Sequence, residues 1–313
     1  MNAPVTFAGA DAISVDVIGV DACRVLAPGR GEVAAVFRRS FYVQLRDGLV
    51  CGGATEIGRG PLNFLFTAAP ADWRSLLARG QPVTVEQNAL RLGDLPPIDL
   101  ARAQVWMPAP FPQWSPATLA AGLAVLEDLL GDFPPPAEGM GCFAAMNPVP
   151  GGMVARALAT PVECYLQWLK AGGPPEAATG IDQLIGAGPG LTPSGDDFLA
   201  GSLLGLHAIG RGALPHKVWE KVAPQLSYRT HAISAAHLSC AAAGRLAETQ
   251  HLLLGSLLSG SRDGLRIGIK AIFAESQTSS WDGLAGMAAT LRAVSGYSIA
   301  AASTGIVAIP ARD

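Results

Sequence analysis

A glycine-rich turn between residues 185 and 197 is the segment of this sequence best suited to chemistry. It reads Ile-Gly-Ala-Gly-Pro-Gly-Leu-Thr-Pro-Ser-Gly-Asp-Asp and leads directly into an apolar stretch. Glycine lets a backbone approach a ligand closely, and the free N–H groups at the start of a helix favour an anion. The turn is therefore predicted to bind a small anionic ligand.

Residue type divides the turn into two sets of candidates. Glycine N–H groups and hydroxyls are suited to holding substrate, and the candidates for that role are Gly188, Gly190, Thr192, Ser194 and Gly195. Asp196 and Asp197 are the candidate catalytic residues. The structural alternative makes Ser194 an N-cap and the two carboxylates favourable charges in the first helical turn, with the glycines serving close packing.

The turn differs from a nucleotide-phosphate loop. No Lys follows the glycines, and two carboxylates at the helix start would repel a bare phosphate. The conflict disappears if Asp196 or Asp197 holds a magnesium ion beside the phosphate, with Asp197 as the candidate ligand. It also disappears if one of the two accepts hydrogen bonds from an amide or ureido NH2 group. The residues leave both readings open.

A second candidate cluster opens a predicted long helix. His231 and Ser234 are three residues apart, so they would share one helical face and could serve proton transfer or substrate positioning. A lone helical histidine is more often a core or surface residue. His231 is nevertheless a candidate catalytic residue, and Ser234 is a candidate substrate contact.

Two further turns carry polar side chains. The hydroxyl-rich segment 278–283 enters an apolar stretch, and Ser280 is either its cap or a ligand contact. In the first hundred residues, Arg59 stands between two glycines and Asn63 follows at a strand start. An exposed Arg there could clamp a carboxylate, with a plain surface turn as the alternative.

The elements before residue 112 are predicted to be strands. Residues 41–45 and 49–51 flank Asp47 and Gly48, a pair that tolerates the positive φ angles of a tight hairpin. A third strand is expected at Leu62–Phe66, and residues 83–92 and 99–105 are suited to more. A small antiparallel sheet or barrel fits this region.

The pattern changes to helical from Ser115. Ser115 is a cap followed by proline, and leucines then recur at helical spacing until the triple proline at 134–136. The stretch to Gly152 is predicted to be a linker or a lid. Further helices are expected over residues 153–170, 196–209, 215–226, 231–258, 264–273 and 281–294. The fold class is therefore α+β, with a β-rich lobe over residues 1–112 and a mostly helical lobe over 113–313 that carries the glycine-rich turn.

Composition argues against nucleic acid and membranes as partners. Lys plus Arg is 22 against 25 for Asp plus Glu, and no basic run stands out, which argues against nucleic acid. Gly, Pro or charge interrupts every apolar stretch before about 18 residues, so no membrane span is expected. The start of the chain lacks the basic residues of a secretory signal, and the five cysteines form no pattern typical of disulfides or zinc. We expect a cytoplasmic protein.

The same motifs resemble a known bacterial family. IGAGPGLTPSGDDFLAG at residues 185–201 is similar to the signature of the AllH-type subunit of oxamate carbamoyltransferase, long catalogued as a domain of unknown function. The resemblance extends to RGPLNF at 59–64, THAISAAHL at 230–238 and SSWDGLAGM at 279–287. It therefore spans most of the chain.

The resemblance implies a role in ureide (allantoin) nitrogen metabolism. An AllH-like chain would work with an FdrA-like subunit and a further partner to interconvert oxalurate plus phosphate with oxamate plus carbamoyl phosphate. Backbone N–H groups, Thr192 and Ser194 would then hold the anionic end of the substrate, and Asp196 or Asp197 its NH2 group. Such transfer relies on positioning and charge stabilisation, which suits a site without an obvious nucleophile.

Two other classes of function remain beside this one. The chain is alternatively a non-catalytic module that binds a small phosphate, carboxylate or nucleotide and regulates its partners. It is otherwise a structural subunit whose glycine-rich turn docks against a neighbour. Asparagine at position 196 or 197 separates these hypotheses, because a ligand role predicts lost binding with an intact fold.

Overall fold

The computed structural model describes residues 12–275 and 278–295. The chain divides into two compact units, each described by itself below. One comprises Met1–Ala109 with the short segment Arg245–Glu248, and the other comprises Pro110–Gly244 with Thr249–Asp313.

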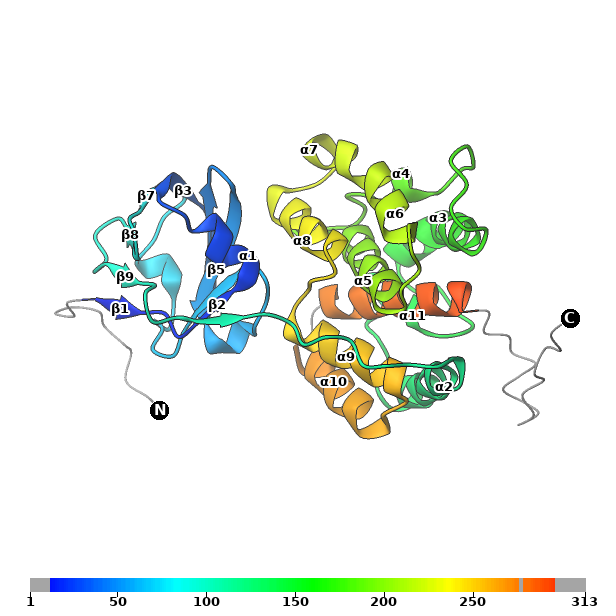
Figure 1. The fold of residues 1–313 in the computed structure, drawn as a ribbon. Helices are drawn as coiled ribbons and strands as arrows, with labels where there is room; N and C mark the ends of the chain where they lie inside the picture. The colour runs from blue at the N-terminus through cyan, green and yellow to red at the C-terminus, as the bar shows by residue number, and fades with distance from the viewer. Residues whose placement is uncertain (1–11, 276–277, 296–313) are drawn as a thin grey trace, which may run out of the picture. The chain divides into compact units, whose positions relative to one another are not determined.

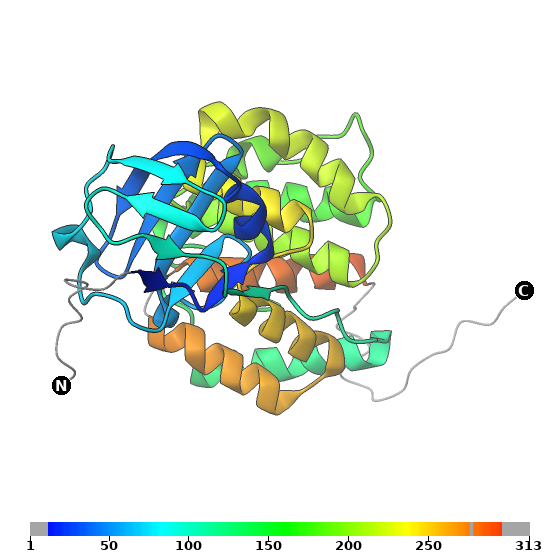
Figure 2. The ribbon, with the colours of Figure 1, turned by 60° about the vertical axis from the view of Figure 1, so that its left-hand side comes forward.

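The first unit is built on a curled, mixed sheet (Figure 1, Figure 2). Its strands are β1 (Ile13–Ser14), β2 (Val17–Gly19), β3 (Gly29–Val36), β4 (Ser40–Leu45), β5 (Gly48–Ala54), β6 (Asn63–Phe66), β7 (Pro82–Val85), β8 (Ala89–Leu92), β9 (Ile98–Asp99) and β10 (Gln104–Trp106). The spatial order is β1-β9-β8-β7-β3-β4-β5-β6-β2-β10. A short helix, α1 (Val20–Val25), follows β2.

The hairpin predicted around Asp47 and Gly48 is confirmed. β4 and β5 pair antiparallel with Leu45 opposite Gly48, so Arg46 and Asp47 form the turn, and Gly48, with a φ of 149°, is the first residue of β5. Residues 83–92 form a second hairpin, β7–β8. The pairs β1–β9, β2–β10 and β5–β6 are parallel, so the sheet is mixed where the sequence suggested an antiparallel one. Strand periodicity reports which face is buried, not which neighbour a strand pairs with.

Aromatic side chains form the centre of this unit. The β4 pattern alternates between buried and half-buried residues, as a strand with one face on a core requires. Phe41 on this strand lies 4.6 Å from the ring of Trp73, and the Phe66 ring lies 5.4 Å from Trp73. All three side chains are fully buried. The sheet therefore has its own hydrophobic core.

The second unit is helical, which confirms the α+β class. Its helices are α2 (Pro116–Asp132), α3 (Met153–Lys170), α4 (Ile181–Leu184), α5 (Ser194–Ala208), α6 (Leu214–Val222), α7 (Leu226–Arg229), α8 (Ala232–Ala242), α9 (Glu248–Ser259), α10 (Arg262–Glu275) and α11 (Ser279–Val294). A 3-10 turn, η3 (Gly141–Ala144), interrupts the long loop between α2 and α3.

Local signals set several of these helix ends. Ser115 and Thr118 form the capping box of α2, and α3 has the bounds predicted from the sequence. The single helix expected over residues 231–258 is instead two helices, α8 and α9. Gly244 lies between them with a φ of 73°, a left-handed conformation that ends a helix.

Two helices occupy the middle of the second unit. α5 and α11 are buried on nearly every side and pack along each other (Figure 1). A Cβ atom on Gly201 would lie 1.9 Å from the Gly283 carbonyl oxygen, and one on Gly286 would lie 1.8 Å from that of Phe198. Only glycine permits this approach. It brings the first turns of the two helices together.

No helix among the described residues is both long and apolar enough to cross a lipid bilayer.

Candidate active site

The glycine-rich turn has the backbone that its sequence predicts. Gly186, Gly188 and Gly190 have φ angles of 72°, 116° and 92°, a region that other residues rarely adopt. A Cβ atom on Gly186 would lie 1.9 Å from the carbonyl oxygen of Arg229, so this glycine is also required for packing. Gly190 is exposed and faces open space. Packing therefore does not require a glycine at position 190.

Helix α5 begins one residue earlier than an N-cap at Ser194 would allow. The N-cap is Pro193, and Ser194 is the first helical residue, with 3% of its surface exposed. Gly195 packs against the carbonyl oxygen of Leu184, which a Cβ atom would approach to 2.0 Å. The Ser194 hydroxyl is thus not used as a cap. It lies instead beside the carboxyl of Asp282 on α11.

Asp196 is a buried residue, and both oxygens of its carboxylate accept hydrogen bonds from the protein. One oxygen accepts a hydrogen bond of 2.7 Å from the backbone N–H of Gly186. The other accepts from the hydroxyl of Thr230 and, at 2.6 Å, from that of Ser234. These contacts join the turn to the start of α8. They favour a structural role for both Asp196 and Ser234.

The neighbouring Asp197 has different surroundings. Its Oδ2 is buried and has no hydrogen-bond partner among the described residues. Burial raises the pKa of Asp197 well above its usual range, and the negative charge of Asp282 raises it further. The hydroxyls of Ser279 and Thr192 act in the opposite direction and do not offset the burial. Asp197 is therefore free to take a ligand.

A second carboxyl, Asp282, completes the site from the first turn of α11. It is fully buried, and its Oδ1 accepts a hydrogen bond of 2.5 Å from the Met140 N–H, just before η3. Its Oδ2 has no partner among the described residues. Burial raises the pKa of Asp282 to about 7, although the Met140 N–H and the Ser194 and Thr278 hydroxyls favour the ionised form.

We call Asp197 and Asp282 the carboxyl pair. Burial raises the pKa of each carboxyl, and the negative charge of Asp282 also raises that of Asp197. The Thr192 hydroxyl lies 2.9 Å from that of Ser279, and both side chains are half-buried. Both hydroxyls also hydrogen-bond to the Asp197 carboxyl, and we call Thr192 and Ser279 the polar rim of the pair.

Sequence reasoning missed Asp282 and chose its neighbour Ser280 from the same turn. The Ser280 carbonyl accepts a hydrogen bond from Gln250, and the N-cap position of α11 is Thr278, whose side chain makes no capping hydrogen bond. The spacing Ser279–Asp282 was a signal, because a hydroxyl followed three residues later by a carboxyl marks a helix start. That pattern predicts only a helix cap, so the buried carboxyl of Asp282 could be recognised only in the structure.

The other sequence candidates have contacts of their own. His231 is exposed and is the N-cap of α8, so it does not share a helical face with the buried Ser234. Arg59 and Asn63 belong to the first unit. Arg59 forms an exposed ion pair of 3.2 Å with Glu248, and the Asn63 amide donates to the Gly58 carbonyl at 2.9 Å. These contacts hold the turn between them in shape.

A metal at Asp197 would need further ligands. The described residues contain no group of three or more His, Cys, Asp or Glu side chains placed to hold an ion. Among the described residues, Asp197 and Asp282 each have one buried carboxyl oxygen without a hydrogen-bond partner. An ion here would take two carboxyl oxygens from the protein and the rest of its ligands from substrate or water.

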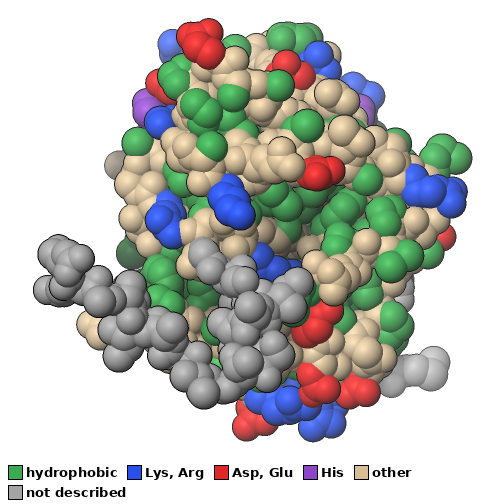
Figure 3. Space-filling view, turned by 90° about the vertical axis from the view of Figure 1, so that its right-hand side faces the viewer, with side chains coloured by type: hydrophobic (Ala, Val, Ile, Leu, Met, Phe, Trp, Pro, Cys, Tyr) green, Lys and Arg blue, Asp and Glu red, His purple; other side chains and the backbone are tan. Residues whose placement is uncertain are grey.

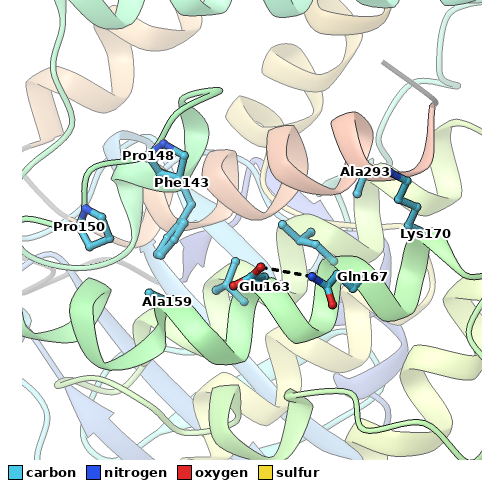
Figure 4. Close-up of a pocket in the computed structure, with 10 residues that line it drawn as sticks. Phe143, Pro148, Pro150, Ala159, Glu163, Gln167, Lys170 and Ala293 are labelled. Atoms are coloured by element: carbon cyan, nitrogen blue, oxygen red, sulfur yellow. Dashed lines mark hydrogen bonds between the residues drawn. The ribbon is translucent and has the colours of Figure 1, made fainter. Parts of the chain in front are cut away.

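The second unit also has an apolar cavity of about 510 Å³. Figure 4 shows it between α3, the loop after η3 and the end of α11, with Phe143, Pro148 and Ala159 on its walls. Glu163 and Gln167 share a hydrogen bond at its edge. Hydrophobic side chains also gather in a hollow of the face seen in Figure 3. Neither residue of the carboxyl pair lines this cavity, and its apolar walls do not suit a small charged substrate.

Comparison with known proteins gives one match. Neither the curated proteins nor the solved structures contain a significant match to this chain. A protein-family model covers the stretch that runs from the end of α4 through the glycine-rich turn to α11, and thus both residues of the carboxyl pair. Residues 184–291 match the family of the oxamate carbamoyltransferase subunit AllH, which confirms the resemblance seen in the sequence for this part of the chain.

Proposed function

We propose that this chain is a subunit of a carbamoyltransferase complex and that the glycine-rich turn and the carboxyl pair form its substrate site. The observation that carries the proposal is the unpartnered, buried oxygen of Asp197 beside a turn shaped by positive-φ glycines. The family match supplies the reaction class, since it covers this segment and names a carbamoyltransferase subunit.

The substrates proposed are oxalurate and phosphate, which would be interconverted with oxamate and carbamoyl phosphate. In this direction a phosphate oxygen forms a bond to the carbamoyl carbon while the bond from that carbon to the oxamate nitrogen breaks. The departing nitrogen takes up a proton. The N–H groups of the exposed residues Gly188 and Gly190 and the hydroxyl of Thr192 would hold the anionic end, and Asp197 would accept from the carbamoyl NH2.

Catalysis at such a site rests on orientation and charge stabilisation. Holding the two reactants in line is worth several kcal/mol of barrier when the site is rigid. The triple acceptor Asp196 supplies that rigidity, because it fixes Gly186, Thr230 and Ser234 around one buried carboxylate. Asp196 thus serves the reaction by keeping the turn in place.

The family name describes a subunit, so we propose that the chain acts in a complex. The proposed partners are an FdrA-like chain and one further subunit. Activity is therefore expected from the reconstituted complex. The decisive measurement is carbamoyl phosphate formation from oxalurate and phosphate, with the native chain and with Asp197→Asn. Asp263 lies exposed in the first turn of α10, so Asp263→Asn is a matched control.

We expect Asp197→Asn to remove at least 99% of the activity while the control retains it. Carbamoyl transfer that proceeds equally well with Asp197→Asn contradicts the proposed site. A complex that assembles and turns over without this chain contradicts the proposed function. Magnesium is varied in the same assay, because an ion held by Asp197 would make the native activity depend on it.

A further inference from the structure

The apolar cavity shown in Figure 4 continues into a second cavity of about 290 Å³. The two share four lining residues, Phe143, Pro148, Leu166 and Ala293. We call the two cavities together the apolar groove. Sites that enclose a small ligand have volumes of about 300–1,000 Å³, so the groove is large enough to hold several side chains.

Three polar side chains that line the groove are engaged by the protein itself. The Glu163 carboxylate accepts a hydrogen bond of 3.2 Å from the Gln167 amide. Arg292 donates to the Ala144 carbonyl at 2.6 Å and forms an ion pair of 3.2 Å with Glu127. The other lining side chains are apolar apart from one lysine. An occupant of the groove would therefore bind mainly through apolar contacts.

Large apolar side chains next to the groove are left in water. Val149 stands between two of the lining prolines, and 82% of its surface is exposed. Met153, at the start of α3, is 81% exposed. Exposed apolar side chains that adjoin an apolar groove typically mark a binding surface.

The segment that follows α11 has the composition of an apolar occupant. Residues 296–313 lie outside the described residues, and their sequence contains no charged residue before Arg312. Positions 306–309 read Ile-Val-Ala-Ile. Segments that stay in water are typically rich in charge and poor in β-branched residues. This composition favours burial against an apolar surface.

The same segment starts beside the groove. Ala293 lines it, and α11 ends one residue later at Val294. Figure 4 shows Ala293 and Lys170 toward one end of the groove and Pro148 and Pro150 toward the other.

The distances allow the apolar run to enter. From Ala159 to Lys170, the groove follows 11 residues of α3, about 16 Å of helix. The 11 residues from Ser295 to Ile306 span up to about 36 Å when extended. A segment tethered so close has an effective concentration on the order of 1 mM, so even a weak apolar contact would be populated.

We propose that the apolar groove binds the chain's own segment 306–309, with the side chains of Ile306 and Ile309 inside it. The inference goes beyond the proposed reaction, since neither residue of the carboxyl pair lines the groove. The bound segment stabilises the helical unit. A partner protein would reach the groove only by displacing this segment.

Photo-crosslinking on the full chain tests the contact directly. Ile306 is replaced by the photoreactive amino acid benzoylphenylalanine, and mass spectrometry identifies the peptides to which it attaches. We expect attachment within one chain to α3 or to residues 143–150. Ala159→Asp places a charge in the groove and should reduce this product roughly fivefold or more, because a charge is costly in an apolar site. Ala157 is exposed on the same helix and does not line the groove, so Ala157→Asp is the matched control.

Thermal unfolding tests the contribution to stability. Ile306→Asp/Ile309→Asp should lower Tm by about 5 °C or more, because two apolar side chains leave the groove. Ser303→Asp/Thr304→Asp adds the same charge to the same segment and should change Tm by less than about 1 °C. Combined with Ala159→Asp, the isoleucine substitutions should have less than half of their effect, since they then lose a contact that is already weakened.

Four outcomes overturn the inference. Crosslinks that lie only outside the groove, no crosslink at all, or the same Tm for the two double variants each does so. A crosslinked product with the mass of two chains would assign the groove to a second copy of the protein. Absence of carbamoyl transfer in the complex overturns the proposed function and leaves this inference standing.

Discussion

The hydroxyl of Thr192 lies 2.9 Å from the hydroxyl of Ser279, although 87 positions of sequence separate the two residues. Thr192 belongs to the glycine-rich turn, and Ser279 is the first residue of α11. Through this contact the glycine-rich turn and the start of α11 form the polar rim, and both hydroxyls also hydrogen-bond to the Asp197 carboxyl. The site thus depends on both segments being present and correctly packed.

Ser279→Ala should weaken this rim. The substitution removes a hydrogen bond between two half-buried hydroxyls, so unfolding in urea should require about 1 kcal/mol less. Ser239 is an exposed serine within α8 that donates to the carbonyl of Ala235. Ser239→Ala is therefore the matched control and should be neutral, since alanine is the better helix former. Equal effects at the two positions would show that the contact with Thr192 adds no stability.

Asp196→Ala should destabilise the chain far more than Asp263→Ala. Removal of this carboxylate leaves three donors without an acceptor, from Gly186, Thr230 and Ser234. A loss on the order of 3 kcal/mol or more in free energy of unfolding is expected, against less than 0.5 kcal/mol for the exposed Asp263. Asp196→Asn should recover part of the loss. Full stability in Asp196→Ala would refute the structural role.

The stability of the chain should depend on pH through Asp282. Its pKa is about 7 in the folded state and 3.8 in the reference, so the folded chain holds a proton that the unfolded chain releases. The stability tied to that proton is complete below pH 4 and is lost as the pH rises to about 7. The loss is on the order of 4 kcal/mol, at about 1.4 kcal/mol per pKa unit.

The Asp282→Asn variant isolates this effect. Burial lowers the pKa of His237 to about 4, which acts in the opposite sense at acid pH, but this contribution is common to both proteins and cancels in the comparison. Urea unfolding between pH 4 and 8 should show native stability falling relative to that of the variant. Parallel curves for the two proteins would mean that Asp282 titrates normally.

Gly286→Ala and Gly205→Ala should have opposite effects although both residues are buried in the central helices. A methyl group on Gly286 would lie 1.8 Å from the carbonyl of Phe198, and α11 would have to move from α5. One on Gly205 meets its nearest atom at 3.6 Å, an ordinary contact. We expect a loss of several kcal/mol for Gly286→Ala and a gain of up to about 1 kcal/mol for Gly205→Ala.

Thermal unfolding of the two variants checks both statements. Unchanged stability in Gly286→Ala would contradict the close packing of the helices.

The sequence by itself determined the elements and the segment that matters. A β-branched and aromatic pattern with a tight turn at Asp47 and Gly48 specified the hairpin, and a serine cap followed by leucines at helical spacing specified α2. These signals are local, so they can be recognised without knowledge of the rest of the chain. The glycine-rich turn was found in the same way, from glycines that open a helix.

Only the tertiary structure decided which carboxyl holds the turn in place and which keeps an unpartnered oxygen. Asp196 and Asp197 are adjacent and identical in type, yet Asp196 accepts from three donors, whereas Asp197 has a buried oxygen without a partner among the described residues. Asp282 comes near Asp197 because Gly201 and Gly286 let the backbones of α5 and α11 touch. The pKa of a carboxyl depends on burial and on charges brought near by folding, and no spacing in the sequence encodes either quantity.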